Sequence, residues 1–183
     1  MSHRRLSFAI VGFVLVMGVG LSSMAGDANA PAKTIMPAVQ IVGHNSKITD
    51  KRFVLVQDER TWRELWSEHT GVAAAGPPTR YEVPMVDFAR YMVVGSFNGA
   101  GTNTDGQIVQ SITPGDGGVR IRFETSSFQT ASFGPGPDKG VKTSCFGLWV
   151  IDRTDKPVIL EQARQGLKAD PVRWVEVKRF EGK

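Results

Sequence analysis

The spacing of hydrophobic residues divides the chain into one amphipathic helix and a series of strands. Between residues 59 and 70, the large side chains recur at positions i, i+3, i+4 and i+7, which share one face of an α-helix: Trp62, Leu65, Trp66 and His69. Asp58 can cap the first turn, and Gly71 is a typical stop. Thr61 and Glu64 have capping-box spacing one turn after Asp58. Two tryptophans on one face of a short helix need an apolar surface, so we expect this helix to pack on a sheet.

The other apolar segments have the length and the patterning of β-strands. Val119 to Glu124 alternates strictly between apolar and charged side chains, as in a strand with one buried face. Phe53–Val56 and Met92–Phe97 are apolar on both faces, which favours places in the middle of a sheet. Further strands are expected at residues 39–42, 107–113, 141–151, 158–160 and 172–180, with a hairpin turn at residues 114–118.

The order of these elements predicts the fold class. Two strands precede the helix, and several strands joined by short connections follow it. Connections of hairpin length join antiparallel neighbours, and the apolar face of a sheet must be covered by another layer. We therefore expect a mainly β (α+β) fold over residues 39–183: an antiparallel curled sheet or sandwich with one packed amphipathic helix.

The first thirty residues have the pattern of a bacterial-type signal peptide. Two arginines precede an apolar run over residues 8–21, and small residues ending in Ala28-Asn29-Ala30 follow. The apolar run is shorter than the roughly 20 residues that a membrane-spanning helix needs. We expect export to the periplasm or the extracellular space, with cleavage after Ala30 and Ala25 as second choice. The exported chain then has a flexible N-terminus over residues 31–38 and no membrane span.

Composition and charge narrow the possible partners. The chain is 41% hydrophobic and 22% charged, as in an ordinary globular protein. Without the leader, 20 basic and 17 acidic residues remain, and the two kinds are interspersed along the sequence. No cluster of basic residues carries interleaved aromatic residues, so we expect no nucleic-acid partner. Cys145 is the only cysteine, which leaves the domain dependent on its hydrophobic core rather than on disulfides.

Residues that could carry catalysis or hold a metal are few and scattered. His44 lies in a polar turn, and His69 ends the helix face, where a histidine is usually packed. Cys145 lies in an apolar strand, which favours a small buried hydrophobe over a nucleophile paired with either histidine. The spacing of these residues fits no zinc site. Core positions are also expected for all four tryptophans. We therefore expect a protein that is not an enzyme and has no catalytic residue, metal ligand or cofactor.

Two polar segments are longer than a simple turn requires. Asn98–Gly106 contains many residues that tolerate a left-handed backbone, and Ser132–Gly140 combines Gly and Pro with one aromatic residue. Long loops on a rigid sheet commonly carry binding sites. We expect both segments to be loops that contact a partner, through the following residues: Asn98, Thr102, Asn103, Asp105, Phe133, Pro135 and Pro137.

Several of these features together resemble the PrcB C-terminal-like domain, over about residues 50–155. The matching positions are Trp62, Leu65 and Trp66 in the helix, Val86-Asp87-Phe88 before the strand Met92–Phe97, Asn98-Gly99, Thr102 to Gly106, Phe133-Gly134-Pro135-Gly136-Pro137, and Ser144 to Ile151. Two positions depart from that family. Thr104-Asp105-Gly106-Gln107 stands where the family tends to have Thr-Gly-Gly-Tyr, and Cys145-Phe146 stands where it tends to have Pro-Tyr.

The resemblance implies an accessory subunit of a secreted or envelope protease complex. On this basis we expect a non-catalytic binding domain that supports the assembly or the stability of such a protease. Two alternatives remain open from the residues alone. One is a peptidase inhibitor that presents Asn98–Gly106 to a peptidase cleft, and the other is a thiol enzyme that uses Cys145. The partner and the oligomeric state do not follow from the sequence.

Overall fold

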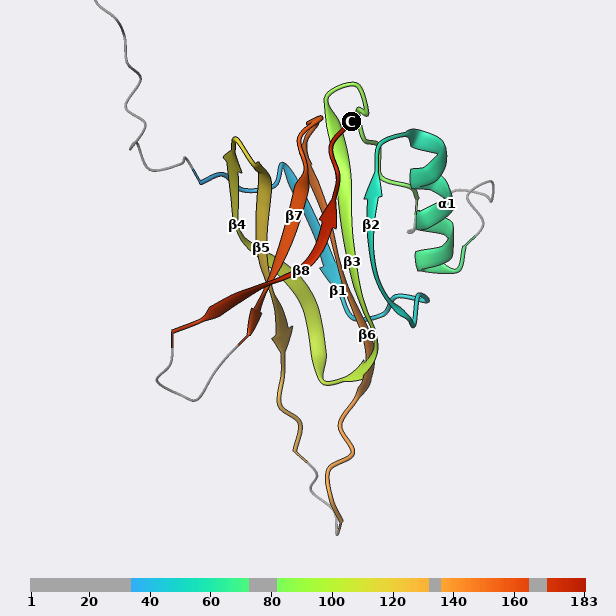
Figure 1. Ribbon diagram of the computed structural model, residues 1–183. Coiled ribbons are helices and arrows are strands. Elements are labelled where there is room, and N and C mark those ends of the chain that lie inside the picture. The colour runs from blue at the N-terminus through green and yellow to red at the C-terminus, as the bar shows by residue number, and fades with distance from the viewer. Residues whose placement is uncertain (1–33, 73–81, 132–135, 165–170) are drawn as a thin grey trace, which may run out of the picture. The chain divides into compact units, whose positions relative to one another are not determined.

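The computed structural model describes residues 34–72, 82–131, 136–164 and 171–183. The chain separates into two units, Met1–Pro31 and Ala32–Lys183, and all the described residues lie in the second. They form one helix and eight strands (Figure 1), with these bounds: β1 Val39–Gly43, β2 Lys51–Val56, α1 Glu59–Thr70, β3 Tyr91–Thr102, β4 Thr104–Gly115, β5 Gly118–Ser127, β6 Lys142–Asp152, β7 Val158–Arg164 and β8 Arg173–Phe180.

The strands form two four-stranded sheets. The first has the order β1-β6-β3-β2, and all its neighbours are antiparallel. The second has the order β4-β5-β7-β8, in which only β5 and β7 run parallel. The parallel pair arises because the chain leaves β5, passes through β6 in the other sheet, and returns to β7. The expected fold class, a mainly antiparallel β-sandwich with one packed helix, is confirmed.

The first sheet is buried on both faces, which creates two cores. On one face α1 covers residues of β2, β3 and β6 (Figure 1), and Trp62 and Trp66 pack there with Phe97, Phe146 and Leu148. On the other face the second sheet packs against the first through a separate cluster, which includes Met92, Ile121, Phe123, Trp149 and Leu160. Alternate residues of β6 enter opposite cores, which explains why this strand is buried from Thr143 to Ile151.

The helix forms as the sequence predicts, with one difference at its start. Asp58 is the N-cap, and its carboxylate accepts a hydrogen bond from the Thr61 backbone nitrogen at 2.9 Å. Thr61 lies inside the first turn and its hydroxyl donates to Asp58, so the capping box expected at Thr61 and Glu64 is wrong. Gly71 ends the helix with φ of 72°. The four residues of the predicted face are all buried.

The strict alternation of β5 is also confirmed. Ile121 and Phe123 are fully buried between the sheets. On the other face of the second sheet, Arg120 and Arg122 both bond to Glu161 of β7, with 2.8 Å from Arg122 Nε to the carboxylate. Burial would raise the pKa of Glu161, but the hydrogen bonds from the two arginines outweigh it and lower this pKa.

Two strand expectations are wrong. Phe53–Val56 was expected in the middle of a sheet, but β2 is an edge strand. Both its faces are apolar because Val56 faces the helix core while Phe53 and Leu55 pack against the core between the sheets. A strand can therefore be covered on both faces of the sheet even where it lies at the edge. In β8, the expected core residue Trp174 is only half-buried, with the Arg122 guanidinium 5.4 Å from its ring.

The expected loop Asn98–Gly106 is mostly strand. β3 continues to Thr102 and β4 begins at Thr104, so Asn103 alone separates them. The left-handed backbone that these residue types predicted occurs at two points, Gly99 with φ of 79° and Asn103 with φ of 58°. The first lies at a β-bulge between Phe97 and Ala100, and the second makes the turn into β4. A bulge and a tight turn satisfy the same residue preferences as a loop.

The start of the described chain is tied to both sheets. Ile35 exchanges backbone hydrogen bonds with Ile112 of β4, and the Ala38 nitrogen donates to Val150 of β6. Ile35 and Ala38, which belong to the expected flexible segment, therefore have defined contacts. The expected signal peptide and its cleavage sites lie outside the described residues. Within the described part of the chain, no helix combines the length and the apolar character needed to cross a membrane.

Candidate functional site

The two segments expected to bind a partner meet at one end of the sandwich, around Asn103. The Asn103 side chain accepts a hydrogen bond from the Val141 nitrogen at 2.7 Å and donates one to the Thr130 hydroxyl at 3.2 Å. Its backbone nitrogen donates to the Val141 oxygen, and its oxygen accepts from the Phe128 nitrogen, each at 2.9 Å. One residue thus joins the β3–β4 turn to the end of β5 and to the segment that leads into β6.

An open depression of about 290 Å³ lies beside this turn, and we call it the Asn103 pocket. It is lined by Thr102, Asn103, Phe128, Gln129, Thr130, Asp138, Lys139 and Gly140. The Asp138 carboxylate accepts hydrogen bonds from the Thr130 hydroxyl at 2.5 Å and from the Gly140 nitrogen at 2.9 Å. These two bonds lower the pKa of Asp138, because they stabilise its charged form. The neighbouring Lys139 is exposed, so the pocket presents charges of both signs.

A second polar pair lies close to the Asn103 pocket. Asp105, the second residue of β4, is 2.9 Å from His44 Nδ1, and both side chains are largely exposed. The His44 ring also lies 6.3 Å from the ring of Phe128, which lines the pocket. The structure therefore brings the candidate residues Thr102, Asn103 and Asp105 to the same end of the sandwich as residues 138–140.

The remaining candidates are divided. Asn98 is half-buried in β3, where it pairs with Lys51 of β2, and it does not line the Asn103 pocket. Pro137 is exposed. Phe133 and Pro135, including the aromatic anchor that the sequence suggested, lie outside the described residues.

Cys145 has the surroundings of a core residue. Its side chain is fully buried, and this burial raises the pKa of its thiol, which a hydrogen bond from Thr104 opposes only in part. The two histidines have other partners, because His44 pairs with Asp105 and His69 with the Ser46 hydroxyl. The interpretation of Cys145 as a small buried residue is confirmed. Among the described residues, no group of three or more His, Cys, Asp and Glu side chains is placed to hold a metal ion.

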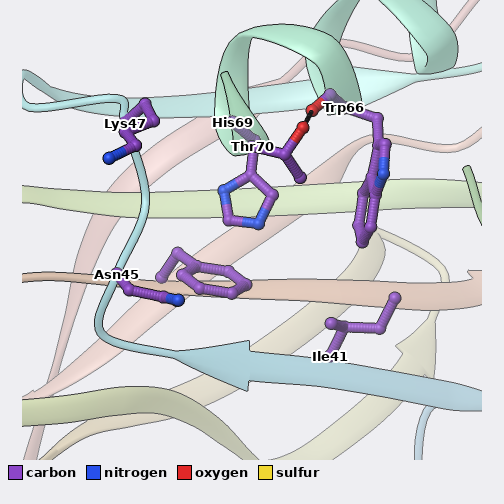
Figure 2. A pocket seen from close by; sticks show the side chains of 7 residues that line it. Ile41, Asn45, Lys47, Trp66, His69 and Thr70 are labelled. Atoms are coloured by element: carbon purple, nitrogen blue, oxygen red, sulfur yellow. Dashed lines mark hydrogen bonds between the residues drawn. The ribbon is translucent and has the colours of Figure 1, made fainter. Parts of the chain in front are cut away.

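The sequence did not indicate a second pocket, at the C-terminal end of α1 (Figure 2). It has a volume of about 320 Å³, is lined by Ile41, Asn45, Lys47, Trp66, His69, Thr70 and Phe146, and is called here the helix-end pocket. Packing of His69 was expected and is confirmed, since its side chain is buried. The signal that could have revealed the pocket is the polar turn after β1, whose length brings Asn45 and Lys47 back over the helix end.

His69 is the central side chain of that pocket. Its Nδ1 lies 2.9 Å from the Ser46 hydroxyl oxygen, which also accepts a hydrogen bond from the Ile48 nitrogen. The rings of His69 and Phe146 meet edge to face with centroids 4.2 Å apart. Burial lowers the pKa of His69 to about 4, because the charged imidazolium would lose its hydration there. His69 is therefore neutral near pH 7.

Comparison with known proteins adds no relative to this description: no family model, no curated protein and no solved structure matches the chain. The fold and the sites define a β-sandwich domain with one packed helix, an open polar pocket at one end and an aromatic pocket of similar volume beside the helix.

Proposed function

We propose that the protein is an exported, non-catalytic accessory domain that binds a secreted or envelope protease through the Asn103 pocket. The observation that carries this proposal is the set of hydrogen bonds by which Asn103 joins three separate segments. A surface held in this way changes little on binding, which reduces the entropy lost in the complex. The protease as partner and the export rest on the PrcB resemblance and on the leader.

The chemistry of the pocket suits an extended polypeptide segment. Residues 128–131 and 136–141 lie beside the pocket outside the strands, so their backbone groups are not all used by a sheet. Asp138 and Lys139 can pair with either sign of charge on a partner, while the half-buried Phe128 offers an apolar contact. Such a mixed polar surface is typical of non-obligate protein–protein contacts.

The same geometry gives less support to the two alternatives. An inhibitor needs an exposed segment of several residues that can enter a peptidase cleft, but β3 and β4 are joined through Asn103 alone. A thiol enzyme needs an accessible thiolate, whereas the Cys145 thiol is buried and has a raised pKa.

The proposal is tested by recovery of a peptidase from an envelope extract on the immobilised protein, followed by binding with the purified pair. Lys139→Glu and Thr102→Arg change exposed side chains of the pocket, so we expect each to weaken binding at least tenfold and to leave thermal unfolding unchanged. Lys178→Glu, an exposed charge reversal on β8, is the matched control and should bind as the parent does.

Two outcomes would count against the proposal. Parental affinity of both pocket variants would remove the Asn103 pocket as the contact surface. Inhibition of the purified peptidase by the parent protein would favour the inhibitor alternative.

Export is tested separately by N-terminal sequencing of the protein from the envelope fraction, where Pro31 is the expected first residue. A protein that retains Met1 would contradict the prediction that the leader is cleaved.

A further inference from the structure

The helix-end pocket has the size and the walls of a small-molecule site. Its volume of about 320 Å³ lies at the lower end of the roughly 300–1,000 Å³ of ligand pockets. A cavity of about 150 Å³ already admits benzene, so this one has room for a flat bicyclic body. Three of its walls are rigid rings from the helix core, since Trp66, His69 and Phe146 are each less than a tenth exposed.

The rings that line the pocket are uncharged and can bind an apolar group. His69 Nδ1 is occupied by Ser46, and the ring is neutral near pH 7. Ile41 of β1 lies across from the Trp66 ring (Figure 2), and the Phe146 ring meets the His69 ring edge to face. A planar aromatic group placed between these side chains gains offset or edge-to-face ring contacts in addition to burial.

Two polar side chains from the turn after β1, Asn45 and Lys47, also line the pocket. Of the seven residues that line it, Lys47 alone carries a formal charge near neutral pH. Its ammonium group forms no ion pair with any described residue, while its backbone nitrogen donates to the His69 oxygen at 2.8 Å. The turn that carries Lys47 is thus fixed to the helix end. Figure 2 shows Asn45 and Lys47 on one side of His69 and Trp66 on the other.

The Lys47 stem also depends on the helix stop. Gly71 has no side chain, and a Cβ built there would lie 3.2 Å from Lys47 Cγ. Glycine at the helix end therefore leaves space for the Lys47 stem to lie across it.

We propose that the helix-end pocket binds a small carboxylic acid with a flat aromatic body, the body lying against Trp66, His69 and Phe146 and the carboxylate pairing with Lys47. The Asn45 amide donates a hydrogen bond to the same carboxylate. This site is separate from the Asn103 pocket, shares no lining residue with it, and does not depend on the proposed partner. Both a free aromatic acid and the C-terminal aromatic residue of a peptide have this chemistry.

The test uses 2-naphthylacetate as the probe and its neutral amide, 2-naphthylacetamide, as the charge control. Binding to the full exported chain is followed by NMR shifts of the His69 and Trp66 ring protons. We expect saturable shifts of both rings with the acid, and an affinity at least fivefold higher for the acid than for the amide. Lys47→Gln should remove that preference, whereas Lys142→Gln, another exposed lysine, should retain it.

A second variant examines the cavity itself. Ile41→Trp fills the pocket from β1 and should abolish binding of both probes. If this variant fails to fold, the ring shifts of the parent protein alone decide whether the pocket binds the probe.

A peptide Gly-Gly-Gly-Trp with a free carboxylate, compared with its C-terminal amide, distinguishes the two sources of the ligand. Stronger binding than that of the naphthyl acid indicates a chain terminus, and weaker binding indicates a free acid. The proposal is overturned if the His69 and Trp66 signals do not move, or if Lys47→Gln keeps the preference for the acid.

Discussion

His69 is a buried side chain whose protonation destabilises the folded state. Its pKa is lowered from 6.5 to about 4, so as the pH falls the unfolded chain takes up the proton first. The free energy of unfolding should therefore decrease between about pH 6.5 and pH 4, and below that range the loss from this group should reach about 3 kcal/mol.

This prediction is checked by urea denaturation over that pH range. His69→Gln should lower stability at pH 7 but flatten the decrease toward pH 4. His44→Gln is the control, because His44 is exposed and pairs with Asp105 at the surface. Equal pH slopes in the parent and in His69→Gln would contradict the assigned cause.

Cys145 should be protected from thiol reagents in the folded state. The side chain is fully buried and its pKa is raised, so both access and thiolate formation are disfavoured. We expect labelling at pH 8 to be at least a hundredfold slower than in denaturant, and Cys145→Ala to bind the partner as the parent does. Rapid labelling of the native protein would restore the thiol-enzyme alternative.

At the scale of elements, the fold should be strongly sensitive to the truncation of the buried side chains of α1. Trp62 is almost fully buried, and its indole nitrogen donates to the Pro84 oxygen at 2.8 Å, which ties the segment before β3 to the helix. Removal of a large aromatic side chain from a core costs about 3–5 kcal/mol, a large share of the roughly 5–15 kcal/mol that stabilises a typical domain.

Trp62→Ala should accordingly lower the midpoint of thermal unfolding sharply. Arg60→Ala on the exposed side of the same helix should change the free energy of unfolding by less than about 0.5 kcal/mol. If both variants unfold at the parental temperature, the helix face does not contribute to the core.

The helix and most strands could be predicted from the sequence because their patterns are local. Asp58, the i, i+3, i+4 face and Gly71 specify α1 within one segment. The edge position of β2 could not be predicted, since the helix covers one of its faces and the second sheet covers the other, which makes both faces as apolar as those of a central strand. Strand order depends on pairings between distant segments, which a local pattern does not contain.

The candidate sites show the same division. Residue types indicated a left-handed backbone within Asn98–Gly106, but not that it would occur at Gly99 and Asn103 in a bulge and a one-residue turn. That Asn103 bonds to Val141 and Thr130 depends on the packing of both sheets at one end. The helix-end pocket is lined by β1, the turn after it, α1 and β6, so the polar turn alone does not show which segments it will meet.

At the scale of the whole molecule, the place of β6 determines when the fold can be completed. β6 lies between β1 and β3, and Val39 near the start of the described chain pairs with Val150, which follows five other strands and the helix. A chain made from its N-terminus cannot complete this sheet until β6 has emerged. Pairings between such distant segments form slowly, because the entropy cost of closing the loop comes before the stabilising contacts. For a protein exported as proposed, late completion of the sheet would keep the chain unfolded while it passes through the membrane.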